Sequence, residues 1–293
     1  MDDLVYHYTD GNGLKGILES GELWCTHIAF LNDSREYLAT VDLYRESLAQ
    51  LSIDPFRDID VRTLARLAIQ LLDERFASAT IAGILPTFVA SFSTEPDDLA
   101  QWRAYGGTGP RFCIAFRREE IEKIRGTTLQ AVTYEDGKAT SDAMRDEFLA
   151  WADALIARRK KAPAPSRIEG THPPEVFVIN AQIIEPRAHL LKHRKYKAEA
   201  EVRLSHEWRR APNSTGEPTK PLLFRSGRSF LIPYVCLDLK ELYRPIHSVT
   251  IGPTPHPFVA QMGLRLLIQR CCGELANGAD DRISVSEVPY RDW

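Results

Sequence analysis

Two polar side chains lie two residues apart near the amino terminus, at His7 and Thr9. The stretch around them reads as a short strand, so these two side chains point to one face while Tyr6 and Tyr8 point to the other. An imidazole beside a hydroxyl can hydrogen-bond a ligand, and a polar pair on a strand that otherwise reads as core indicates a cleft. A hydrogen-bonded core histidine on an edge strand is the alternative interpretation.

A carboxylate begins a second expected strand, at residues 201–208. Alternation puts Glu201 and Arg203 on the face opposite the apolar Val202. A carboxylate fixed on a strand can stabilise positive charge that develops during a reaction. Glu199 is the nearby alternative acid, and a solvated charged strand face is the competing interpretation.

Residues 11–16, GNGLKG, have the spacing of a dinucleotide-binding glycine turn, and Asp33 supplies an acidic residue about twenty positions on. A Rossmann strand is nearly all apolar because it is buried on both faces, whereas the strand before this turn carries polar residues. The expected strands also bunch at residues 201–251 instead of alternating with helices. The sequence therefore favours an ordinary loop and helix start, with Gly21 as a left-handed cap at the helix end.

Several other kinds of site lack the residues they require. The five cysteines form no CxxC pair, which excludes a zinc ribbon or a disulfide framework on spacing. His189 and His193 are four apart, a spacing that can chelate zinc on a helix, but no acid stands between them in the metalloprotease pattern. No G-x-S-x-G elbow and no P-loop occurs, so serine hydrolase and ATPase interpretations have no motif. We therefore predict no metal site.

The whole composition is that of a soluble globular protein. The chain has 293 residues, is 44% apolar and 26% charged, and has no apolar run long enough to span a bilayer. Its amino terminus lacks the basic start and apolar middle of a signal peptide, so we expect a cytoplasmic protein. A net charge of −3 argues against a dedicated nucleic-acid coat, but it leaves room for a local basic patch.

Periodicity predicts an α+β domain with helical insertions. Apolar residues recur every three or four positions over residues 35–51 and 61–79, which indicates two amphipathic helices and an insertion at about 35–80. No repeat and no composition shift divides the chain, so we expect a single domain over residues 1–293. The other expected strands are 5–8, 23–31, 87–93, 111–116, 129–134, 222–225, 230–237, 249–251 and 283–288, and the other expected helices are 14–20, 97–105, 144–161, 176–195 and 257–275.

YHYT at residues 6–9, followed by the helical sequence GLKGILESGEL, resembles the opening of the ADP-ribosyltransferase fold. The likeness is to DNA-modifying bacterial toxins and, more distantly, to poly(ADP-ribose) polymerases and RNA 2′-phosphotransferases. More closely, the chain resembles an uncharacterised bacterial domain family, and that resemblance covers almost the entire chain. The motifs behind it are YHYT, LND at 31–33 with Glu36, SFS at 91–93, QWRAYG at 101–106, EVRL at 201–204, IGP at 251–253 and SEVPYR at 286–291.

The transferase resemblance implies an α+β fold with a split antiparallel β-sheet core and helical insertions. In those transferases the matching histidine and the hydroxyl two residues on hold the adenine-side ribose of NAD, which implies that role for His7 and Thr9. A tyrosine at the end of a helix stacks on nicotinamide, which implies that role for Tyr105 and the opposite wall for Phe92. Trp102 and Tyr105, three apart on a helix, also read as a packed aromatic stripe.

The resemblance implies that Glu201 is the catalytic acid. Cleavage of the bond from nicotinamide to ribose passes through an oxocarbenium-like ion, and a carboxylate near the sugar stabilises its positive charge. Arg103 and Arg203 are candidates for the pyrophosphate, because guanidinium matches paired phosphate oxygens, although either can equally be a surface ion pair. The implied catalytic set is His7, Tyr105 and Glu201, and the implied NAD-binding set is Tyr6, His7, Thr9, Ser91, Phe92, Ser93, Arg103, Tyr105 and Arg203.

The function so implied is transfer of ADP-ribose from NAD, used as a substrate and without a metal, to a protein or nucleic-acid acceptor. The same resemblance implies that the protein is a toxin or an anti-phage effector, with an antitoxin or another regulator as its partner. Basic residues at 158–161 and 192–197 can attract a nucleic-acid acceptor, although solvated helix ends also explain them. A non-catalytic sensor that binds a nucleotide or a partner protein on the same fold, and an RNA 2′-phosphotransferase-like enzyme, remain the alternatives.

Overall fold

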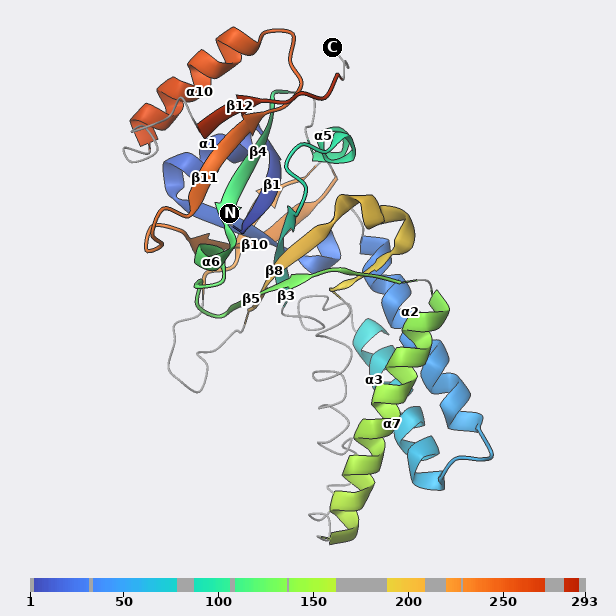
Figure 1. Cartoon of the computed structure of the whole chain (residues 1–293). Coiled ribbons are helices and arrows are strands. Elements are labelled where there is room, and N and C mark those ends of the chain that lie inside the picture. Colours follow the sequence, from blue (N-terminus) through green and yellow to red (C-terminus); the bar gives the residue numbers. More distant parts are fainter. Residues whose placement is uncertain are drawn as a thin grey trace. The chain divides into compact units, whose positions relative to one another are not determined.

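A computed structural model describes residues 3–31, 34–77, 87–105, 109–135, 137–161, 189–208, 220–227, 229–271 and 282–289 (Figure 1). The chain divides into two compact units. Unit 1 contains Met1–His27, Thr87–Val132 and Lys195–Trp293, and unit 2 contains Ile28–Pro86 and Thr133–Arg194. The helical insertion expected at about 35–80 therefore falls in unit 2, which also takes a second, later stretch of the chain.

Unit 1 is built on one large sheet. The strands run in the order β12-β11-β4-β1-β3-β2-β10-β9, with β8 paired to β3 and β5 paired to β8. Their bounds are β1 Leu4–Asp10, β2 Glu22–His27, β3 Thr87–Ser93, β4 Arg111–Arg117, β5 Thr127–Ala131, β8 Glu201–Glu207, β9 Leu223–Ser226, β10 Leu231–Asp238, β11 Ile246–Ile251 and β12 Ile283–Val285. Neighbours are antiparallel except β11 and β12, which are parallel, so the sheet is mixed. The prediction of an α+β fold is confirmed.

The sheet divides at β3. Along one edge, β3 pairs with β8 over its whole length, from Thr87 to Ser93. The other edge is shared, because β2 pairs with Phe88 and Val89 while β1 pairs only at Ser93. Strands β1 and β2 therefore separate from each other beside β3, and β1 continues along β4. Since β1 is antiparallel to both neighbours, the Rossmann interpretation of the glycine turn is wrong.

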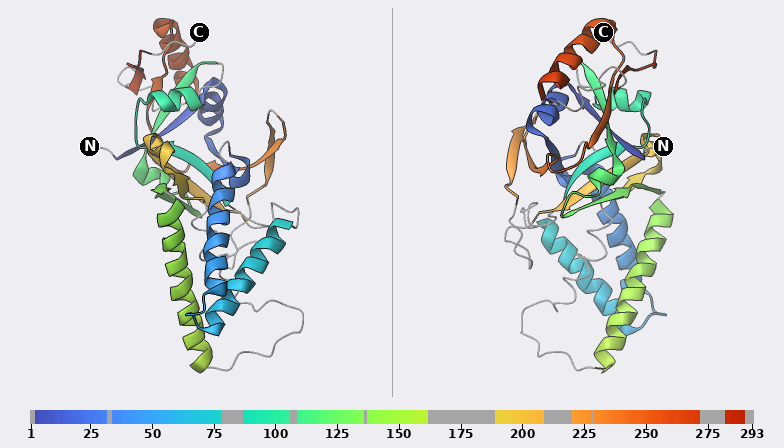
Figure 2. Two further views of the ribbon diagram at one scale, coloured as in Figure 1. Left: turned by 90° about the vertical axis from the view of Figure 1, so that its right-hand side faces the viewer. Right: turned by 60° about the vertical axis from the view of Figure 1, so that its left-hand side comes forward.

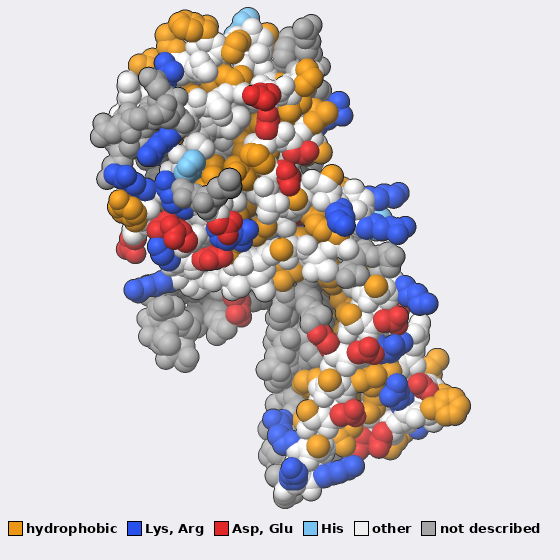
Figure 3. All heavy atoms as spheres, viewed as in Figure 1, with side chains coloured by type: hydrophobic (Ala, Val, Ile, Leu, Met, Phe, Trp, Pro, Cys, Tyr) orange, Lys and Arg blue, Asp and Glu red, His pale blue; other side chains and the backbone are white. Residues whose placement is uncertain are grey.

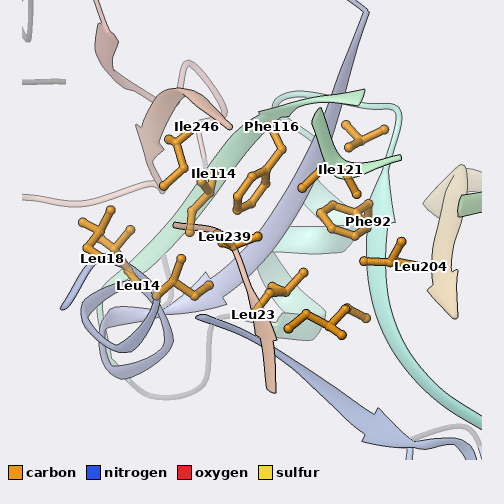
Figure 4. Packing of buried hydrophobic residues seen from close by; sticks show 14 of the residues in the cluster. Leu14, Leu18, Leu23, Phe92, Ile114, Phe116, Ile121, Leu204, Leu239 and Ile246 are labelled. Carbon is orange, nitrogen blue, oxygen red and sulfur yellow. The ribbon is translucent and has the colours of Figure 1, made fainter. Parts of the chain in front are cut away.

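One face of this sheet forms the main core (Figure 4). Alternate residues of β3 and β8, such as Phe92 and Leu204, point into it, together with Phe116 of β4. Helix α1 (Gly11–Ser20) adds Leu14 and Leu18. Helix α10 (Pro257–Cys271) adds two further buried residues. Burial of these apolar side chains is the main force that holds the strands in register.

The caps of α1 explain its position at the end of β1. Asp10 is the N-cap residue, and its carboxylate accepts a hydrogen bond from the Gly13 amide. Gly21 ends the helix with φ 64°, and its amide donates to the Ile17 carbonyl. This left-handed cap confirms the prediction for Gly21, because glycine adopts positive φ without a Cβ penalty. The chain then returns directly as β2.

Unit 2 is mainly helical, and its helices α2 (Ser34–Ile53), α3 (Ile59–Ala77) and α7 (Gly137–Lys161) are seen from two further sides in Figure 2. Helix α2 contacts both α3 and α7. Buried apolar residues such as Tyr44 and Leu48 line α2 at helical spacing. A short parallel pair, β6 (Thr133–Glu135) with β7 (Leu191–His193), completes the described part of this unit together with the turn η1 (Ile28–Phe30).

The structure differs from the sequence prediction in several places, and α7, β11 and β12 have other bounds than expected. The strand expected at 23–31 ends at His27, where η1 begins. The strand expected at 129–134 is two strands, β5 and β6, interrupted at Val132. The α-helix expected at 176–195 is wrong where the structure describes it, because residues 191–193 form β7 and the 3-10 helix η3 (Arg194–Glu199) follows. None of the described helices is long and apolar enough to cross a membrane.

Candidate functional site

Three of the predicted site residues lie in one row across three strands. Tyr6 of β1 pairs with Ser93 of β3, and Ser93 pairs with Glu201 of β8. Directly paired residues point to the same face of a sheet, and this face is opposite the main core, because Phe92 and Val202 point into that core. The YHYT, SFS and EVRL motifs therefore meet.

Glu201 is held in a buried ion pair with Arg203. The Arg203 Nε donates to Oε1 of Glu201 at 2.7 Å, and Nη2 donates to Oε2 at 3.0 Å. The two side chains are only 4% and 5% exposed, so neither the solvated strand face nor a surface ion pair describes them. The Arg203 guanidinium, predicted to bind a pyrophosphate, is buried against the Glu201 carboxylate instead of facing solvent.

The backbone just before Glu201 makes a tight turn. Ala200 has φ 42°, which is the left-handed region, and its carbonyl accepts from the Thr94 amide at 3.0 Å. The Ser93 hydroxyl donates to the Glu199 carbonyl at 2.8 Å. These two bonds tie the start of β8 to the end of β3. They place Glu201 at the first position of the strand, whereas the alternative acid Glu199 lies in η3.

Further motifs gather around Trp102 of α5 (Leu99–Tyr105). The Trp102 side chain is 1% exposed and meets the Tyr8 ring edge-on, with centroids 4.8 Å apart. Its Nε1 donates to Oδ1 of Asp97 at 2.6 Å. A Cβ added at Gly252 would lie 3.0 Å from Trp102 Cε3, so the IGP motif needs glycine there to pass so close.

Asp97 also binds the carboxy-terminal motif. Oδ1 of Asp97 accepts from the Ser286 hydroxyl at 2.6 Å, and Oδ2 accepts from the Glu287 amide at 2.9 Å. The Tyr8 hydroxyl binds the backbone on both sides of Asp97, because it donates to the Glu95 carbonyl and accepts from the Asp98 amide. Burial raises the pKa of Tyr8 far above its ordinary value, so the hydroxyl stays a donor. The segment between β3 and α5 is thus fixed by side chains from distant parts of the chain.

His7 projects to the other face of β1. Its Nδ1 lies 2.9 Å from the Ser91 carbonyl oxygen, and because a carbonyl only accepts, Nδ1 carries the proton. Its ring lies 5.7 Å from the Phe92 ring, centroid to centroid. Burial lowers the pKa of His7, so the imidazole is neutral at pH 7 and Nε2 is an acceptor. The core-histidine interpretation is right about the hydrogen bond, but β1 is not an edge strand.

His7 and Thr9 do not share a face of the sheet with Glu201. Alternation along β1 puts His7 and Thr9 on the core side, whereas Glu201 lies on the opposite side with Tyr6. His7 lies beside the point where β1 and β2 diverge, since its Nδ1 donates to the Ser91 carbonyl of β3.

The remaining predicted residues have mixed outcomes. Phe92, predicted to form a wall for nicotinamide, is 2% exposed and points into the main core, away from the Glu201 face. Ser91 lies on the Glu201 face and pairs with Arg203. Arg103 is exposed on α5. Tyr105 is the last residue of α5, but its side chain is outside the described residues, as are Asn32 and Asp33.

Two other sequence hypotheses can be compared with the structure. His193 lies in β7 rather than on a helix, so the helical spacing proposed for zinc with His189 is absent. Among the described residues no cluster of His, Cys, Asp or Glu could hold a metal ion. The basic residues of η3 are exposed, and Figure 3 shows Lys and Arg side chains gathering where η3 lies, whereas Lys192 is buried. The basic residues at 158–161 form the last turn of α7, where positive side chains interact favourably with the helix dipole.

Sequence reasoning missed Asp97, Gln101 and the structural role of Trp102. Gln101 is buried, and its side-chain amide donates to the Glu199 carbonyl at 3.1 Å. A signal existed in the run Asp97-Asp98, which precedes α5 and offers caps. Asp98 does cap this helix, because its Oδ2 accepts a hydrogen bond from the Gln101 backbone amide.

A DUF2971 domain is found at residues 101–204. The description of this family is "Protein of unknown function". The DUF2971 match begins at Gln101 in α5 and ends at Leu204 in β8, so it includes Trp102 and the Glu201–Arg203 pair. No curated protein and no solved structure matches the chain.

Proposed function

We propose that this protein is an NAD-dependent ADP-ribosyltransferase with an ADP-ribosyltransferase-like split sheet, and that Glu201 is its catalytic acid. The single observation that supports this best is the row Tyr6–Ser93–Glu201 beside the separation of β1 from β2. In the reaction, the bond from the ribose C1′ to the nicotinamide nitrogen breaks, and nicotinamide leaves with the bonding electrons. A nucleophile of a protein or nucleic-acid acceptor then bonds to C1′ and loses its proton.

The environment of Glu201 suits a group that stabilises positive charge. Its carboxylate accepts two hydrogen bonds from Arg203 and is almost fully removed from solvent. A charge fixed in surroundings of low dielectric acts more strongly on a developing cation than one in water. The carboxylate would face the ribose, hold its 2′-hydroxyl and stabilise the oxocarbenium-like transition state.

His7 would act at the other end of the cofactor. A neutral imidazole whose Nδ1–H is bound to Ser91 offers Nε2 to a ribose hydroxyl, and its side chain is partly exposed. His7 and Glu201 lie on opposite faces of the sheet, and in this proposal NAD would bind where β1 and β2 diverge, with one ribose toward each residue. Tyr105, at the end of α5, would stack on nicotinamide. The acceptor would approach from the side of Glu201.

The test is incubation of the protein with labelled NAD and cell extract, comparing wild type with Glu201→Gln. We expect the variant to lose about two to three powers of ten in nicotinamide release and label transfer, because a preorganised charged group is removed. NAD affinity should change only a few-fold. Glu207→Gln, on the same strand but exposed, is the matched control and should keep full activity. Glu199→Gln separates the two candidate acids.

Unchanged label transfer in Glu201→Gln would show that the proposed mechanism is wrong. Absence of both NAD binding and nicotinamide release in the wild type would remove the transferase proposal and favour the sensor function. His7→Ala tests the other end separately. Unchanged NAD affinity in this variant would show that the cofactor does not reach the core side of β1.

A further inference from the structure

We infer that Arg203 is a positioning residue that sets the orientation and the charge of Glu201. This inference rests on the proposed function of Glu201. Both residues project from the same face of β8, two positions apart, and both have almost no exposed surface. Arg203 does not contact the cofactor in this proposal. It acts through the carboxylate.

The geometry restricts the carboxylate to one plane. The Nε and Nη2 donors of Arg203 reach different oxygens of Glu201, at 2.7 and 3.0 Å. Such two-point binding holds the carboxylate plane against rotation, which a single ammonium group cannot do.

The neighbours in register are uncharged. Arg203 pairs with Ser91 of β3 on one side and with Gln130 of β5 on the other, and Glu201 pairs with Ser93. On β1 the titratable side chain in the same row is Tyr6, whose pKa burial raises, so it is neutral over the working range. In the adjoining η3, Lys197 is exposed. Of these described groups, Arg203 is the buried cation that balances the Glu201 charge.

Two consequences follow if Arg203 is removed. The carboxylate gains rotational freedom, and a displacement of about 1 Å at a catalytic group reduces rate by roughly 100-fold. The carboxyl group also requires a higher pH to ionise, because a neighbouring cation favours the charged form. A residue that binds the pyrophosphate of NAD would instead raise the KM with little effect on the pH profile.

The experiment measures nicotinamide release against pH for wild type, Arg203→Gln and Arg203→Lys. For Arg203→Gln we expect kcat to fall by about 10- to 100-fold, KM for NAD to change less than about threefold, and the acidic limb to move up by about one pH unit. Arg203→Lys retains a cation, so it should restore the acidic limb but only part of kcat. Arg125→Gln, which removes an exposed arginine shortly before β5, is the matched control for loss of charge.

Each outcome decides the inference. Wild-type kcat and an unmoved acidic limb in Arg203→Gln would overturn it, and so would a rise in KM alone. If Arg203→Gln fails to fold, as judged by circular dichroism, Arg203→Lys decides, because full kcat in that variant refutes two-point positioning. An inactive wild type that does not bind NAD overturns the proposed function, and the inference with it. An active wild type with unaffected Arg203 variants overturns the inference alone.

Discussion

The contact between Thr9 and the first turn of α1 gives a sharp test of the glycine turn. A Cβ added at Gly13 would lie 1.9 Å from Thr9 Oγ1 and 3.2 Å from Thr9 Cβ. Gly16, in the same helix, has no atom within 4 Å of such a Cβ. Both glycines lie in α1, but of the two only Gly13 has a neighbour that an added Cβ would meet. This makes Gly16→Ala a matched control for Gly13→Ala.

The expected free energies follow from this difference. Replacing glycine by alanine within a helix ordinarily stabilises a protein by about 0.5–1 kcal/mol, which is our expectation for Gly16→Ala. At Gly13 the same gain is opposed by an overpacking cost of about 1–3 kcal/mol, because Thr9 must rotate or α1 must move. We therefore expect Gly13→Ala to lower the free energy of unfolding by about 1 kcal/mol, which is roughly 2 kcal/mol below Gly16→Ala.

Urea unfolding followed by circular dichroism measures these differences as shifts of the midpoint. Thr9→Ala removes the obstructing hydroxyl, so Gly13→Ala should no longer destabilise in that background, and the pair should couple by about 1–2 kcal/mol. If Gly13→Ala proves as stable as Gly16→Ala, then Thr9 does not approach the helix as described. The glycine turn would then need another explanation.

Two further predictions concern His7 and Ala200. Burial lowers the pKa of His7 in the folded state, so the unfolded chain binds more protons and the free energy of unfolding should fall as the pH drops below about 6.5. His7→Gln should weaken this pH dependence between pH 7 and 5, as measured by thermal melts. An unchanged pH dependence in the variant would contradict the prediction. Ala200→Gly should raise the free energy of unfolding by about 1 kcal/mol, because glycine tolerates the φ of 42°, whereas Ala104→Gly in the exposed part of α5 should lower it by about the same amount. A loss of stability in Ala200→Gly would show that this residue is not strained.

Local pattern was enough to predict most strands and their faces. The bounds 87–93 agree with β3, because an alternating apolar run there lies between Pro86 and a polar turn. Alternation also assigned Glu201 and Arg203 to the side opposite Val202 correctly. The same alternation rule puts Phe92 on the core side, opposite Ser91, as the structure shows.

The errors arose where distant parts of the chain decide the outcome. The burial of Glu201 and Arg203 depends on what covers their face, and no local spacing reports that. The separation of β1 from β2 depends on pairing between segments far apart in sequence, which sets His7 and Glu201 on different faces. The helix expected at 176–195 failed at its end because pairing of β7 with β6 overrides local helical propensity.

The bonds of Asp97 have a consequence for the order of folding. Ser93 binds a partner 106 residues later in the chain, and Asp97 binds one 189 residues later. During synthesis the earlier segments emerge first, so the segment between β3 and α5 cannot acquire all of its native contacts until Ser286 has been translated. We therefore expect the surroundings of Glu201 and Trp102 to reach their final geometry late in folding.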